Sequence, residues 1–164
     1  MAIRRVEVQR FSVVSSKPFP DVVAKLEAAV SHPDMQALGR NIAAAGTRTE
    51  LENVIQPVVG ASGLMEFTRF DIGGVLRRYQ GERARRSLRL VVGNPLIMKQ
   101  MVEHVPDAAS YAPVTILVDE RADGVHLSYD RMTSFLAPYE SMDALRVAQD
   151  LDTKVEALLT AAAA

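Results

Sequence analysis

The stretch PVTILVDERADGVHLSYD, residues 113–130, decides the fold. It contains two runs in which apolar and polar residues alternate, separated by the turn sequence Asp123-Gly124. Alternation with a period of two is typical of a strand with one buried face. An Asp-Gly pair favours a tight turn between antiparallel strands, because glycine adopts a positive φ at no steric cost. The stretch therefore predicts a β-hairpin.

Three more segments predict strands. Residues 87–92 (SLRLVV) alternate cleanly, whereas residues 63–74 (GLMEFTRFDIGG) are apolar on both parities. The latter strand must be bulged or covered on both faces. Residues 4–15 change parity midway, which predicts a bulge near Gln9 or Arg10.

Apolar residues at three- and four-residue spacing predict helices over 17–33, after Asn94, and from Ser141 onward. Residues 34–59 predict an inserted helical hairpin within a single domain, 1–164. Strands joined by hairpins favour an antiparallel sheet, and grouped helices favour one face of it. We therefore predict an α+β fold, an antiparallel β-sheet with helices packed on one face.

Composition excludes several functions. A chain of 164 residues with a net charge of -1 has no overall field that attracts nucleic acid or an anionic membrane. The chain has no cysteine, which excludes disulfides, thiolate nucleophiles and cysteine zinc sites. We find no secretory signal and no apolar run of the ~18 residues that a spanning helix needs. These features predict a cytoplasmic protein.

The tripeptide Gly93-Asn94-Pro95 joins a strand to a helix. Asn94 is suited to cap the helix that Pro95 begins. The alternative is a site where helix N–H groups hold a carboxylate or phosphate. The segment has no glycine-rich phosphate loop, so we interpret it as a structural cap.

Basic residues concentrate between Arg77 and Arg89. Six arginines and one glutamate give this segment +5, so the rest of the chain carries -6. Guanidinium groups suit phosphate, which would make the segment an anion or nucleic-acid patch. Aromatic residues form only 5% of the chain, which disfavours a stacking platform for single strands. We interpret the segment as a solvated loop and strand edge.

Several short motifs in order resemble the bacterial domain-of-unknown-function family 302. The matching residues are Asp71 at a strand end, the Gly93-Asn94-Pro95 turn, Pro113 at a strand start, and Ser128-Tyr129. The match is firm over residues 63–130 and loose over 4–62. The resemblance implies a β-α-β(4)-α core of the TATA-binding-protein-like kind, often homodimeric, with no settled activity.

One position departs from this family. Ile72 stands where the family usually has histidine after Asp71. Any acid-base or metal chemistry of that Asp-His pair would be lost here. His32, His104 and His126 have no metal-ligand spacing between them, so we expect neither a metal nor a cofactor.

Two main functional hypotheses follow, and enzyme activity is disfavoured. The first is a binding or assembly module that dimerises over a free sheet face carrying Val91, Thr115 and Leu117. The second is an anion-binding sensor or enzyme with a small-molecule pocket at the strand ends. Its candidate ligand-binding residues are Asp71, Asn94, Arg77, Arg89 and Tyr129. Nucleic-acid binding through the arginines is a third, weaker hypothesis.

Overall fold

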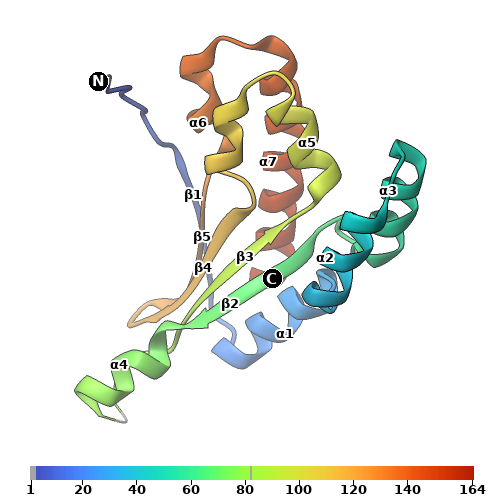
Figure 1. Cartoon of the computed structure of the whole chain (residues 1–164). Coiled ribbons are helices and arrows are strands. Elements are labelled where there is room, and N and C mark those ends of the chain that lie inside the picture. Colours follow the sequence, from blue (N-terminus) through green and yellow to red (C-terminus); the bar gives the residue numbers. More distant parts are fainter. Residues whose placement is uncertain (1–2, 82) are drawn as a thin grey trace.

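The computed structural model describes residues 3–81 and 83–164 and contains one antiparallel sheet (Figure 1). Its strand order is β1-β5-β4-β3-β2, and every neighbouring pair is antiparallel. The strands are β1 (Arg10–Ser15), β2 (Met65–Asp71), β3 (Ser87–Gly93), β4 (Val114–Arg121) and β5 (Gly124–Asp130). The first and last strands of the chain are therefore neighbours.

The hairpin β4–β5 is confirmed. Its register runs from Ile116 opposite Tyr129 to Arg121 opposite Gly124. Gly124 has φ 138°, and a Cβ there would lie 2.6 Å from the carbonyl oxygen of Ser15. Glycine is thus required both by its backbone conformation and by the closeness of β1.

Most helices lie on one side of the sheet, as the α+β prediction required (Figure 1). The longest, α7, has 22 residues and packs on β1 and β5. The helices are α1 (Phe19–Ala29), α2 (Met35–Ala44), α3 (Arg48–Ile55), α4 (Ile72–Gln80), α5 (Pro95–Val102), α6 (Met132–Leu136) and α7 (Met142–Ala163). Short 3-10 turns are η1 (Gln56–Val58), η2 (Pro106–Ser110) and η3 (Ala137–Tyr139). In the described part of the chain, no helix combines the length and apolarity needed to cross a membrane.

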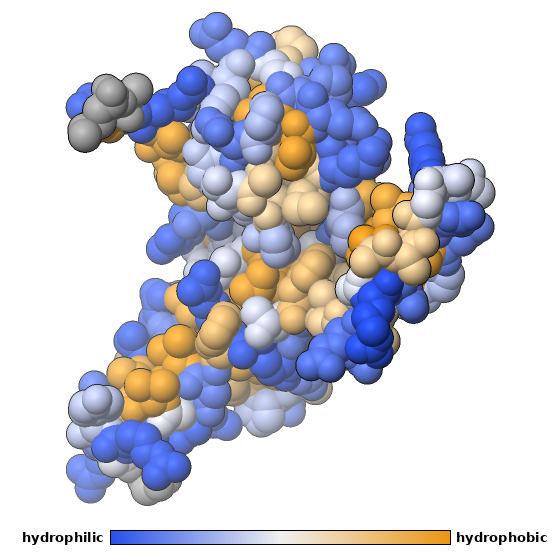
Figure 2. Space-filling view, viewed as in Figure 1, coloured by the Kyte–Doolittle hydropathy of each residue, from blue (hydrophilic) through white to orange (hydrophobic). Residues whose placement is uncertain are grey.

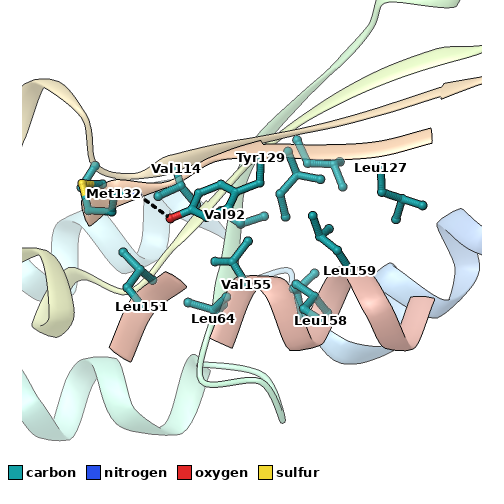
Figure 3. Close-up of a cluster of buried hydrophobic side chains, with 14 of the residues drawn as sticks. Leu64, Val92, Val114, Leu127, Tyr129, Met132, Leu151, Val155, Leu158 and Leu159 are labelled. Carbon is teal, nitrogen blue, oxygen red and sulfur yellow. Dashed lines mark hydrogen bonds between the residues drawn. The ribbon is translucent and has the colours of Figure 1, made fainter. Parts of the chain in front are cut away.

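The core lies between the sheet and α7 (Figure 3). Alternate residues of the strands, such as Leu90, Ile116 and Leu127, are fully buried against it. Val155 and Leu159 of α7 face them. Burying large aliphatic side chains on one face supplies the main driving force for folding, at ~1.5–3 kcal/mol each.

Residues 34–59 hold α2 and α3. The Asp34 side chain caps α2 by accepting hydrogen bonds from two backbone N–H groups. Thr47 and Glu50 form a reciprocal capping box at the start of α3. Leu38 and Ile55 form a small second cluster with Met65 of β2, so this segment packs on the edge of the sheet.

The predicted bulge in β2 is present, whereas the bulge predicted near Gln9 is not. The β2–β3 register shifts between Glu66 and Thr68. β1 begins only at Arg10 and pairs with β5 without interruption as far as Ser15. β5 ends at Asp130, so the residues before Arg10 have no strand to pair with.

Helix α4 was not predicted. It begins directly after Asp71, whose carboxylate accepts a 2.7 Å hydrogen bond from the Gly74 N–H. It ends at Gly81, which has φ 77°. Two glycines near its start hide the helical pattern because of their low helix propensity, whereas the Asp71 cap favours a helix start. Residues 77–80 of this basic segment therefore lie in α4 and residues 87–89 in β3, so the segment is not a loop and strand edge alone.

Candidate functional site

One face of the sheet is turned away from the helices, and we call it the open face. Because side chains alternate along a strand, paired residues share a face. The open face carries Arg10 and Ser12 of β1, Ser128 and Asp130 of β5, Thr115 and Leu117 of β4, and Arg89 and Val91 of β3. The three residues predicted for a free face, Val91, Thr115 and Leu117, therefore lie together.

A groove of about 670 Å³ lies over this face. Val91, Thr115 and Leu117 form part of its floor. One wall comes from Tyr111 and Phe135, whose rings stack with centroids 4.8 Å apart. Pockets that hold small molecules commonly have ~300–1,000 Å³, so the groove has room for a ligand.

The two arginines that line the groove, Arg10 and Arg89, differ in their ion pairing. Arg10 donates two hydrogen bonds, of 2.6 and 2.9 Å, to the carboxylate of Asp130. This bidentate pair raises the pKa of the Arg10 guanidinium above its ordinary value. Arg89 has only a 3.5 Å contact with the Thr115 hydroxyl and lies 5.7 Å from the centre of the Phe70 ring. Among the described groove residues, Arg89 is thus the guanidinium without a carboxylate partner.

Tyr129, a predicted ligand-binding residue, belongs to the core instead. Its side chain points to the helix-covered face and is 1% exposed (Figure 3). Its hydroxyl donates a 2.5 Å hydrogen bond to Asp152 of α7. Burial, and then the charge of Asp152, raise the pKa of the Tyr129 phenol. The Tyr129 hydroxyl thus lies on the helix-covered face, while another part of the residue lines the groove on the open face, and ligand binding by Tyr129 stays a prediction.

Asp71 and Asn94 do not converge on a pocket. Asp71 pairs with Leu88, whereas Asn94 follows Gly93, which pairs with Met65 at the other end of β2. Met65 and Asp71 are six residues apart along β2, which corresponds to roughly 20 Å between the two ends of this strand. A strand-end pocket that uses both side chains is therefore not formed.

Each of these two residues has a local structural role. Asp71 caps α4 and accepts a 3.1 Å hydrogen bond from Arg77. Asn94 accepts a hydrogen bond from the Leu96 N–H at the start of α5 and donates one to the Gly63 carbonyl. Asn94 therefore caps α5, which is the structural interpretation of the Gly93-Asn94-Pro95 turn.

The basic segment is partly neutralised. Arg77 pairs with Asp71, Arg85 with Asp119 at 3.3 Å, and Arg86 with Glu120 at 2.9 Å. These pairs leave fewer cations free for phosphate than the sequence indicates. Arg77 and Arg89, two of the predicted site residues, also lie on different elements, α4 and β3.

The structure places Ile72 in a helix and gives two of the histidines a carboxylate neighbour. Ile72 is the first residue of α4 and is 37% exposed. His126 contacts Asp123 at 2.8 Å, and His32 lies 3.6 Å from Glu66. Over residues 3–81 and 83–164, no group of three or more candidate metal ligands is found.

Sequence reasoning missed Arg10, Tyr111 and Phe135 as groove residues. Arg10 could have been found by extending the alternation of residues 11–15 backwards. Tyr111 and Phe135 lie outside the strands and carry no periodic signal. Only the folded chain brings them to the open face.

The fold and groove define a helix-backed antiparallel module with an open, hollowed sheet face. Residues 41–162 match the family model described as domain of unknown function DUF302, and the chain belongs to this family. A crystal structure of an uncharacterized conserved protein DUF302 from Bacillus stearothermophilus is similar, with a TM-score of 0.65 and 12% identity. The similarity covers 93% of this chain and 97% of that one. No curated protein matches the chain. The family resemblance seen in the sequence is thereby confirmed.

Proposed function

We propose that this chain is a non-catalytic assembly module that works as a homodimer. In this proposal helix α4 and the adjoining end of the open face bind a second copy. We also propose a bacterial cytoplasmic location, for which the absence of cysteine is suitable.

An exposed apolar stripe on α4 carries the proposal. Ile72, Val75 and Tyr79 follow one another at three- and four-residue spacing and are 37%, 57% and 87% exposed. Phe70, just before the helix on the open face, is 48% exposed. Figure 2 shows orange side chains over α4, away from the main body. A contiguous apolar patch of this kind is typical of a protein interface.

Helix α4 has little support from its own chain. It is nine residues long, packs mainly against β3, and buries only Gly73. Figure 1 shows it extending beyond the lower end of the sheet, apart from the other helices. Isolated helices of fewer than ~12–15 residues are marginal in water. A partner that covers the stripe would supply the missing stabilisation.

Charge complementarity favours a second copy as this partner. The segment 77–89 carries +5, and ion pairs with Asp71, Asp119 and Glu120 within the same chain reduce this to +2, against -3 for the remaining residues. The basic α4 region of one copy therefore complements the acidic remainder of another. It does not complement the α4 of that copy, because like charges would meet.

The experiment is light scattering after gel filtration at micromolar concentration. We expect twice the 17.9 kDa mass of one chain. Val75→Asp places a charge in the stripe and should weaken the dimer at least ~10-fold, since an unpaired buried charge is costly. Met142→Asp is the matched control, because Met142 is 77% exposed at the start of α7.

Two outcomes would contradict the proposal. A monomer at all concentrations would exclude the homodimer. A Val75→Asp protein as dimeric as Met142→Asp would exclude α4 as the interface. Circular dichroism of both variants checks that the fold is retained.

A further inference from the structure

The groove on the open face is complete within one chain. Its floor comes from β3 and β4, and the Tyr111–Phe135 stack closes one end. Val91 and Leu117 on this floor are half-buried, so part of their apolar surface is still available. No α4 residue lines the groove, so no feature of the groove depends on the proposed dimer.

The groove lining carries one excess positive charge. It contains two arginines, Arg10 and Arg89, and one carboxylate, Asp130. Asp130 is already bound to Arg10 by two hydrogen bonds. The excess charge therefore resides on Arg89, whose guanidinium is free to form a fork with a ligand anion.

Apolar surface and cation lie next to each other. Arg89 is paired across the strands with Leu117, and Val91 with Thr115. The aromatic stack stands beyond Thr115, since Tyr111 lies three residues before β4 and Phe135 belongs to α6. A ligand here meets the Arg89 cation at one end and the aromatic stack at the other. Between them it meets the aliphatic floor, beside Thr115 and the neutral Arg10–Asp130 pair.

We propose that this groove binds an amphiphilic monoanion, such as an aliphatic or aromatic carboxylate. The anion binds Arg89, and the apolar body lies over Leu117 and Val91 toward Tyr111 and Phe135. A dianion such as a phosphate monoester fits less well, because Asp130 offsets the second arginine.

Binding can be measured with the fluorescent aryl sulfonate 8-anilinonaphthalene-1-sulfonate. We expect saturable binding with one probe per chain, checked by calorimetry. Decanoate should displace the probe, and 1-decanol, which has the same chain length without the charge, should displace it at least ~10-fold less well. The reason is that decanoate can accept charge-assisted hydrogen bonds from Arg89, whereas the neutral alcohol cannot.

Arg89→Gln tests the anion contact. It should weaken decanoate binding by roughly 10-fold or more and leave 1-decanol binding unchanged. Arg40→Gln is the matched control, since Arg40 is an exposed arginine on α2, outside the groove. Leu117→Asn should weaken both ligands, because it removes apolar floor without removing the cation.

The following results distinguish a failure of the proposed groove site from a failure of the proposed dimer. The monomeric Val75→Asp protein should still bind decanoate with unchanged affinity. Loss of binding in that variant would overturn a site built within one chain. Absence of saturable binding, or equal affinities for Arg89→Gln and Arg40→Gln, would overturn the site itself, whatever the oligomeric state.

Discussion

The carboxylate of Asp152 on α7 accepts a 2.5 Å hydrogen bond from the Tyr129 hydroxyl on β5. The same carboxylate accepts hydrogen bonds from the backbone N–H groups of Met132 and Thr133 at 2.7 and 3.1 Å. It thereby caps α6 from another helix. Through these hydrogen bonds, one buried carboxylate on α7 connects the end of β5 to α6.

Replacing Asp152 with Asn should be strongly destabilising. The amide has one acceptor oxygen where the carboxylate has two, and Asp152 is 1% exposed. We expect a loss of about 2–4 kcal/mol in the free energy of unfolding, because buried donors lose their partners. Urea denaturation measures this loss. The exposed Asp150→Asn on the same helix is the control and should change little.

Tyr129→Phe should cost less, about 1.5–3 kcal/mol, because Asp152 keeps its other donors. The pKa of Tyr129 is raised in the folded state, by burial first and then by Asp152. The stability it contributes is therefore full below the unfolded value of 10.0 and falls as the pH rises above it. Thermal denaturation should show the difference between wild type and Tyr129→Phe narrowing above pH ~10. A difference that widens there would contradict this assignment.

The Arg86–Glu120 pair gives the opposite pH dependence. Hydrogen bonds from Arg86 lower the pKa of the Glu120 carboxyl below its ordinary 4.5. Because the folded value is depressed, the contribution is present above pH 4.5 and is lost as the pH falls. Glu120→Gln should slightly lower the melting temperature at pH 7, and its effect should diminish as the pH is lowered below 4.5. Glu7→Gln, at an exposed position before β1, is the matched control.

Gly124→Ala should destabilise the hairpin turn, while Gly39→Ala should not. Gly124 has φ 138°, and the added methyl would lie 2.6 Å from the Ser15 carbonyl oxygen. A loss of at least ~1–3 kcal/mol is expected. Gly39 lies within α2 with no atom within 4 Å of an added Cβ, so alanine should stabilise by about 0.5–1 kcal/mol. Equal effects of the two variants on urea denaturation would contradict this contrast.

Short-range signals in the sequence predicted most of the fold. The Asp123-Gly124 turn predicted β4–β5, and Ser141 predicted the helix start that the structure has at α7. Helix α4 escaped prediction because its first turn contains Gly73 and Gly74, which have low helix propensity, although its apolar residues have helical spacing. Periodicity reports which side of an element is apolar, and it does not report whether that side meets the core.

The candidate site was harder to predict than the fold. Alternation along the strands correctly grouped Val91, Thr115 and Leu117 on one face. The prediction that Asp71 and Asn94 share a pocket failed. Each residue lies at the carboxyl end of a strand, and the carboxyl ends of the adjacent antiparallel strands β2 and β3 point in opposite directions. The groove wall depends on contacts between residues distant in sequence, such as Tyr111 with Phe135, for which a single sequence gives no signal.

Because β1 pairs with β5, the sheet can be completed only late in the synthesis of the chain. β1 leaves the ribosome before the other described strands, yet β5, the strand with which it pairs, starts at Gly124. At ~5–20 residues per second, β1 waits roughly 5–20 s before it can pair. During translation β1 must therefore remain soluble without β5. The five-stranded sheet is complete only after β5 has been made.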